Sequence, residues 1–280
     1  MFLNALQFAE VFPLETLIGY GLLGAFAGTL AGLLGVGGGL VIVPVLIFLW
    51  QPEVVGGAPL GGSQAMQLAI GTSLAVIVFT SFSSVSAHHR HGSVLWSVFW
   101  RLTPGILLGA FLGAMLASSL PQAALKTVFG LFELLVAAQM IVGAHAMKQR
   151  GMPGPLGMGL AGSVIGTLSA LVGIGGGTMT VPFLNACKVR MQQAVGTSAA
   201  CGLPIAVGGA LSYMMLGWGN GQLPTGSAGF VYGPALFGIA LTSVLFAPLG
   251  AALAHRLPTP VLKRIFAGFL GLLGVWMLSA

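Results

Sequence analysis

The sequence predicts an all-α protein that crosses a membrane many times and consists of two inverted copies of one unit. Of its 280 residues, 56% are hydrophobic and only 5% are charged, and the mean hydropathy is +1.01. A soluble domain carries about a quarter charged residues, so most of this surface must face lipid. Since a spanning helix needs roughly 20 apolar residues, about eight to ten membrane segments fit this length.

A repeated glycine motif indicates the duplication. Residues 28–46 read GTLAGLLGVGGGLVIVPVL and residues 166–184 read GTLSALVGIGGGTMTVPFL, with eleven of nineteen positions identical. Further along, Ala-Ile-Gly-Thr-Ser at 69–73 recurs as Ala-Val-Gly-Thr-Ser at 194–198. Internal similarity of this kind predicts two copies of one structural unit.

The expected elements follow this division into a first repeat, residues 1–150, and a second repeat, residues 151–280. Each glycine motif is predicted to break its apolar segment, because three glycines in a row disfavour a helix by roughly 1 kcal/mol each. Whether the broken segments span or re-enter stays open. In order, the apolar segments are a broken hairpin at 16–50, helices at 65–87, 94–118 and 124–146, a broken segment at 155–187, and helices at 194–216, 229–254 and 260–279.

The basic residues predict the orientation. If the loop His88–His91 is cytoplasmic, counting the crossings places nine of the ten Lys and Arg residues on that side and leaves only Lys126 outside, as the positive-inside rule requires. The basic loop 88–101 corresponds to the uncharged loop 217–228, so equivalent loops lie on opposite sides and the repeats are inverted. We therefore expect an inner-membrane protein with its basic loops in the cytoplasm and both termini in the periplasm. Orientation, rather than nucleic-acid binding, then explains the net charge of +6.

The glycine breaks predict an anion site. A helix that restarts before Pro44 or Pro182 would present free N–H groups and about half a positive charge to the centre of the protein. Helix N-termini bind anions in this way without a charged side chain. The alternative is that the glycines only allow close helix packing, which we favour for Gly28 and Gly32. The predicted backbone donors are Gly37, Gly38, Gly39, Gly175, Gly176 and Gly177.

Hydroxyl groups follow each break at matching positions. Thr72 and Ser73 in the first repeat, and Thr197 and Ser198 in the second, could complete the hydrogen bonds of an anion. They could equally cap a helix or bond back to a carbonyl of their own helix. The sequence leaves both readings open.

A single carboxylate, Glu133, lies in the middle of an apolar helix. Because such a residue is expensive in a membrane, it is a candidate carrier of a coupling proton, with a structural hydrogen bond as the alternative. His88, His89 and His91 are read as solvated loop residues, so no metal and no cofactor are expected. The sequence has no Walker loop, no HExxH and no GxSxG motif.

On its two glycine motifs, the sequence resembles the TauE/SafE family of sulfite and organosulfonate exporters, over essentially its whole length. The resemblance implies a secondary transporter, with export the expected direction, for a small sulfur-containing anion. A passive anion channel and, from another class, an integral membrane enzyme are the alternatives. The expected partners are the lipid bilayer, the anion and a coupling proton; pairing with a second copy of the chain stays open.

Overall fold

The structure is a computed structural model that describes residues 14–34, 37–50, 62–142, 151–254 and 259–279. Within these residues it is an all-α membrane protein, as predicted. Between α9 and α10 it has one short β-hairpin, whose two strands are two residues long each. Six of its helices are long and apolar enough to cross a bilayer. The elements are α2 (Leu14–Leu34), α3 (Gly39–Leu49), α4 (Ala65–Arg90), α5 (Trp96–Ser119), α6 (Gln122–Val142), α7 (Pro155–Val172), α8 (Gly177–Ala186), α9 (Met191–Leu216), β1 (Ser227–Ala228), β2 (Val231–Tyr232), α10 (Gly233–Ala254) and α11 (Thr259–Ser279).

Both apolar segments that carry a glycine motif are broken where the motif predicts a break. Helix α2 ends at Leu34 and α3 begins at Gly39, after Gly37 and Gly38 with φ of +84° and +71°. Helix α7 ends at Val172, Gly173 follows with φ of +74°, and α8 begins at Gly177. With 11 and 10 residues at about 1.5 Å each, α3 and α8 are long enough for only about half a bilayer.

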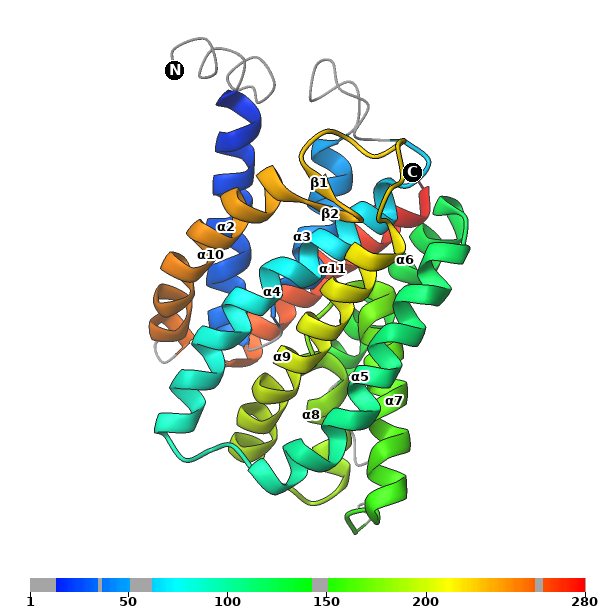
Figure 1. Cartoon of the computed structure of the whole chain (residues 1–280). Helices are drawn as coiled ribbons and strands as arrows, with labels where there is room; N and C mark the ends of the chain where they lie inside the picture. The colour runs from blue at the N-terminus through cyan, green and yellow to red at the C-terminus, as the bar shows by residue number, and fades with distance from the viewer. Residues whose placement is uncertain (1–13, 35–36, 51–61, 143–150, 255–258, 280) are drawn as a thin grey trace.

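The helices of the two halves pack in matching pairs. Helix α5 lies along α7 and α10 lies along α2, while α6 packs on α11 and α4 on α9 (Figure 1). On α5, a Cβ at Gly105, Gly109 or Gly113 would overlap a backbone carbonyl group of α7. Gly28 of α2 approaches the backbone of Ser243 in α10 equally closely, which confirms the packing interpretation of Gly28. Such small residues let membrane helices pack backbone against backbone.

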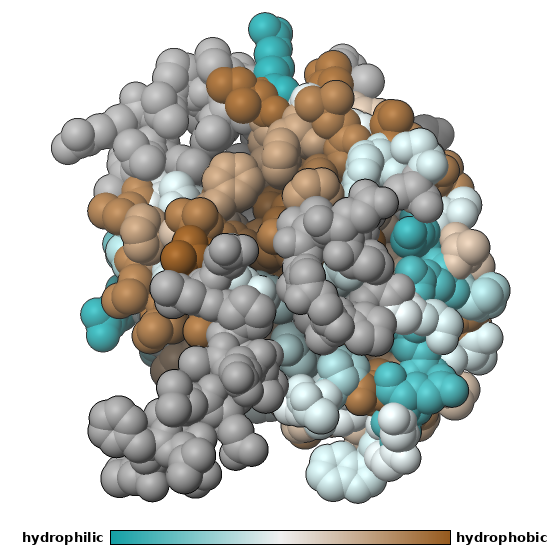
Figure 2. Space-filling model, turned by 90° about the horizontal axis from the view of Figure 1, so that it is seen from above, coloured by the Kyte–Doolittle hydropathy of each residue, from teal (hydrophilic) through white to brown (hydrophobic). Residues whose placement is uncertain are grey.

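The outer surface suits a lipid environment. Large apolar side chains on the long helices are exposed, among them Leu22, Phe82 and Leu241. Hydrophobic residues recur along the upper and left parts of the outline when the molecule is seen from above (Figure 2). Trp100 near the start of α5 and Trp218 beyond the end of α9 are exposed at opposite ends of the molecule, where tryptophans favour the membrane–water interfaces.

Four of the seven described Lys and Arg residues gather at one end of the molecule and one lies at the other, while Lys263 and Arg264 lie in the first turns of α11. The end of α4, the start of α5, the end of α8 and the start of α9 meet at the lower end of the molecule in Figure 1, which we call the basic end. It holds Arg90, Arg101, Lys188 and Arg190, whereas Lys126 lies in the first turns of α6 at the opposite end. Three of the ten Lys and Arg residues and one glycine of the first motif lie outside the described residues: Lys148, Arg150, Arg256 and Gly35.

Candidate functional site

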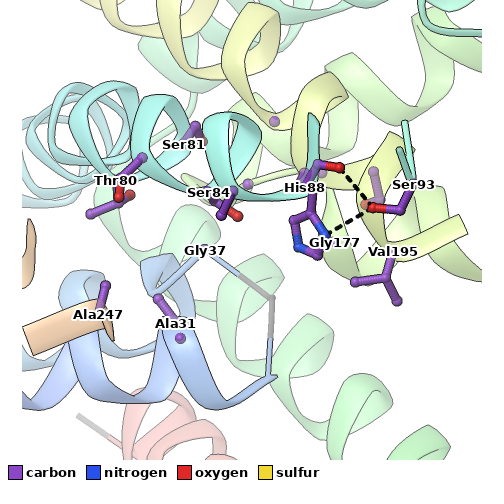
Figure 3. A pocket seen from close by; sticks show the side chains of 18 of the residues that line it. Ala31, Gly37, Thr80, Ser81, Ser84, His88, Ser93, Gly177, Val195 and Ala247 are labelled. Atoms are coloured by element: carbon purple, nitrogen blue, oxygen red, sulfur yellow. Dashed lines mark hydrogen bonds between the residues drawn. The ribbon is translucent and has the colours of Figure 1, made fainter. Parts of the chain in front are cut away.

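A cavity of about 840 Å³ extends from the glycine breaks to the basic end of the molecule. Helix α4 supplies much of one wall through Thr80, Ser81, Ser84 and His88 (Figure 3). Among the described residues, the lining contains no Asp or Glu side chain. The remaining lining residues are Ala31, Gly32, Gly37, Ser83, Ala87, His91, Ser93, Gly175, Gly176, Gly177, Met191, Gln192, Val195, Ser198, Ala199, Gly202, Ala247 and Pro248.

The N-terminus of α8 lies at this cavity. The first backbone hydrogen bonds of the helix run from Met179 N and Thr180 N to Gly176 O, at 3.3 and 2.8 Å. Within the described residues, the N–H groups of Gly176, Gly177 and Thr178 have no acceptor. Three free donors at the positive end of a helix dipole form an anion-binding arrangement.

The two glycine breaks meet each other. A Cβ on Gly37 would lie 3.3 Å from the Cα of Gly175, and a Cβ on Gly39 would lie 2.9 Å from the Cα of Ile174. Of the six glycines predicted to bind an anion, Gly37, Gly175, Gly176 and Gly177 line the cavity, while Gly38 and Gly39 do not. In this conformation the cavity therefore meets the N-terminus of α8 rather than that of α3.

Ser198 is the predicted hydroxyl that lies at the cavity. It is 1% exposed, and its Oγ has no hydrogen-bond partner among the described residues. An unpaired hydroxyl in a membrane interior is unfavourable unless a ligand or water pairs with it. Ser198 and the α8 amides thus offer donors that the protein itself leaves unused.

The other three predicted hydroxyls lie outside the cavity lining and make hydrogen bonds within the fold. Thr72 Oγ1 accepts a bond from Tyr232 N at 2.9 Å, just before α10, and Thr197 Oγ1 accepts one from Leu95 N at 2.9 Å, just before α5. Ser73 Oγ donates to Gly173 O at 2.9 Å and so ties α4 to the second glycine break. Each threonine therefore binds the backbone at the start of a helix in the other half, and Thr72 Oγ1 also donates to Leu68 O of its own helix at 2.6 Å, so Thr72 shows both roles that the sequence left open.

Glu133 is completely buried, at the contact of α6 with α11, and it is not part of the cavity lining. Neither carboxyl oxygen has a hydrogen-bond partner among the described residues. The structural hydrogen bond considered as its alternative role is therefore not present in this part of the chain.

The mouth of the cavity contains residues that the sequence did not single out as a site. Figure 3 shows the His88 ring beside Ser93, with Nδ1 3.3 Å from Ser93 Oγ. Ser93 Oγ also donates to His88 O at 3.0 Å. Ser81 and Ser84 were missed as well, because the repeat comparison selects only polar residues that recur in both halves. These residues could have been identified from their spacing, because Ser81, Ser84 and His88 lie on one face of a helix.

Three comparisons bear on the identity of the chain. The family described as sulfite exporter TauE/SafE matches residues 20–277. A Haemophilus influenzae protein named as a probable membrane transporter is 38% identical, covering 89% of this chain and 93% of its own. Similarly named proteins of Methanocaldococcus jannaschii and Bacillus subtilis are 28% and 30% identical and cover 97% and 90% of this chain, and 97% and 93% of their own. No solved structure matches significantly.

Proposed function

We propose, from the premise that this chain belongs to the sulfite exporter TauE/SafE family, that it is a secondary transporter exporting a small sulfur oxyanion such as sulfite or an organosulfonate. The membrane transporter class follows from the family and from the relatives. The proposal of an anionic substrate rests on the N-terminus of α8 and on Ser198. Within the described part of the chain, their donors are unpaired and the cavity they share has no carboxylate.

The position of the cavity favours a carrier over a channel. Its mouth residues, His91, Ser93 and Gln192, all belong to the basic end. A second hollow, of about 310 Å³, lies at the opposite end, between the start of α4 and residues 222–224. Buried apolar side chains of α4 between these hollows, including Ile70, Leu74 and Ile77, separate them. A passive channel would need a continuous path, whereas alternating access needs a closed layer on one side.

We further propose that residues 1–150 and 151–280 are inverted repeats and that the basic end is cytoplasmic. The matching helix pairs, with α5 on α7 and α10 on α2, support the repeats. The basic residues Arg90, Lys188 and Arg190 at one end support the orientation. An anion would then enter the cavity from the cytoplasm, as export requires.

The test is counterflow in proteoliposomes that contain the purified chain. Vesicles preloaded with unlabelled sulfite should take up labelled sulfite transiently above the outside concentration, because a carrier exchanges substrate across the membrane. Gly176→Leu, which places a bulky side chain at the start of α8, should abolish the exchange. Simple equilibration without overshoot would show a channel, and no sulfite-dependent flux in the wild type would refute the proposed substrate.

A further inference from the structure

Gly202 on α9 leaves a small space open between two hydrogen-bond donors of other elements. A Cβ at this position would lie 3.3 Å from Ser81 Oγ on α4 and 3.6 Å from Gly176 N at the start of α8. All three residues line the cavity. Because glycine has no side chain to cover them, both donors face an open space into which an oxygen atom in contact with the Gly202 Cα would fit.

Both donors, and a third beside them, lack protein partners within the described residues. Ser81 is 7% exposed and makes no hydrogen bond, whereas Thr80 and Ser86 on the same helix bond back to carbonyls of α4. Gly176 N also has no acceptor. Ser198 lies one helical turn before Gly202 on α9 and has an unpaired, buried Oγ. The donors of α4 and α8 therefore meet at one part of the cavity, with Ser198 one turn away on α9.

The described residues of the first half leave no equivalent space. In the alignment that pairs Gly-Thr-Ser 71–73 with Gly-Thr-Ser 196–198, Gly202 corresponds to Ile77 and Ser81 corresponds to Ala206. The side chain of Ile77 is fully buried, with Cδ1 3.1 Å from the Cβ position of Gly39. The Ile77 side chain thus fills the position that Gly202 leaves open, and Ala206 has no hydroxyl where the second half is matched to Ser81. In the part of the chain that the structure describes, such an opening lies only beside the N-terminus of α8.

We propose that the space beside Gly202 is a subsite for one oxygen of a compact oxyanion, held by the Ser81 hydroxyl and the Gly176 amide with Ser198 alongside. The ligand class is an anion with a pyramidal or tetrahedral head, such as sulfite or a short sulfonate. The organic group of a sulfonate would extend along Ala31, Ala247 and Pro248 in the same cavity. This inference rests on the proposed function, because it assigns the anion's contacts at the site proposed there.

The test is the affinity of purified full-length variants for sulfite and for ethanesulfonate, measured by titration calorimetry. Gly202→Ala puts a methyl group in the subsite and should weaken binding about tenfold or more, as expected for loss of hydrogen bonds to a charged group. Its melting temperature should not fall, because alanine favours a helix over glycine. Ser81→Ala should weaken binding by a similar factor, and Ser81→Thr, which keeps a hydroxyl, should retain most of it.

The double variant tests whether the two residues serve one subsite. Gly202→Ala with Ser81→Ala should bind no more weakly than Gly202→Ala alone. Gly268→Ala, on an exposed face of α11 with no atom near its Cβ position, is the matched control and should bind like the wild type. Wild-type affinity in Gly202→Ala, or multiplied losses in the double variant, would overturn the subsite while sulfite counterflow by the wild type still upheld the proposed function. Absence of both binding and counterflow in the wild type would overturn both.

Discussion

At the scale of single residues, neighbouring hydroxyls have different surroundings. Thr197 holds the backbone N–H of Leu95 at the start of α5, while Ser198, the next residue, lies at the cavity with no partner in the described part of the chain. A side chain that pairs with the fold contributes to stability, and one left unpaired can contribute to binding. Adjacent substitutions should therefore separate the two roles.

Thr197→Val keeps the shape of the side chain but leaves the Leu95 N–H without an acceptor. We therefore expect the free energy of unfolding to fall by about 1–3 kcal/mol. Ser198→Ala removes an unpaired hydroxyl and should weaken sulfite binding without lowering the melting temperature. Thermal melts and calorimetric titrations of both variants check this pair. A Thr197→Val protein that melts normally but binds sulfite poorly would instead place that hydroxyl at the anion.

At the same scale, Glu133 is proposed to carry the coupling proton. It is buried without a partner among the described residues. Placing a carboxyl group there costs free energy, which a role in transport would explain. Glu133→Gln should abolish sulfite accumulation driven by an imposed pH gradient and spare sulfite counterflow, which needs no net proton movement. Accumulation at the wild-type rate would exclude Glu133 from coupling.

At the scale of elements, glycines determine how closely the helices approach. A Cβ on Gly109 would overlap the backbone of Ser163, so α5 and α7 must separate when a side chain is added. We expect Gly109→Ala to destabilise the protein by about 1–3 kcal/mol through overpacking, despite the helix propensity of alanine. Gly268→Ala provides the control on a helix face without such a contact. Equal melting temperatures for these two variants would show that α5 and α7 do not pack this closely.

The sequence predicted elements better than contacts. The triglycine motifs fixed both helix breaks, because consecutive glycines disfavour a helix wherever they occur. The roles of Thr72 and Thr197 could not be chosen from sequence, since a hydroxyl selects its partner from groups that only the tertiary fold brings near. Ser81 escaped notice because its counterpart is Ala206, and the importance of Gly202 depends on two donors from other elements.

At the scale of the whole molecule, one cavity reaches the basic end and buried apolar residues of α4 separate it from the opposite hollow. Such an arrangement predicts one-sided access. With Cys187 and Cys201 replaced by serine and alanine, a cysteine introduced at Ser84, which lines the cavity, should react with a membrane-impermeant thiol reagent applied from the basic end and not from the other. Inside-out and right-side-out vesicles provide the two sides, and equal labelling from both would indicate an open channel.

The central claim is that two interrupted helices meet inside the bilayer and that the free amides of α8 bind an oxyanion there. Anomalous diffraction from crystals soaked in selenite, a heavier analogue of sulfite, tests it most directly. The account predicts a selenium peak at the start of α8, within reach of Gly176 N, Ser81 and Ser198. Selenium found only at the surface lysines and arginines, or a map in which both triglycine segments continue as unbroken helices, would contradict it.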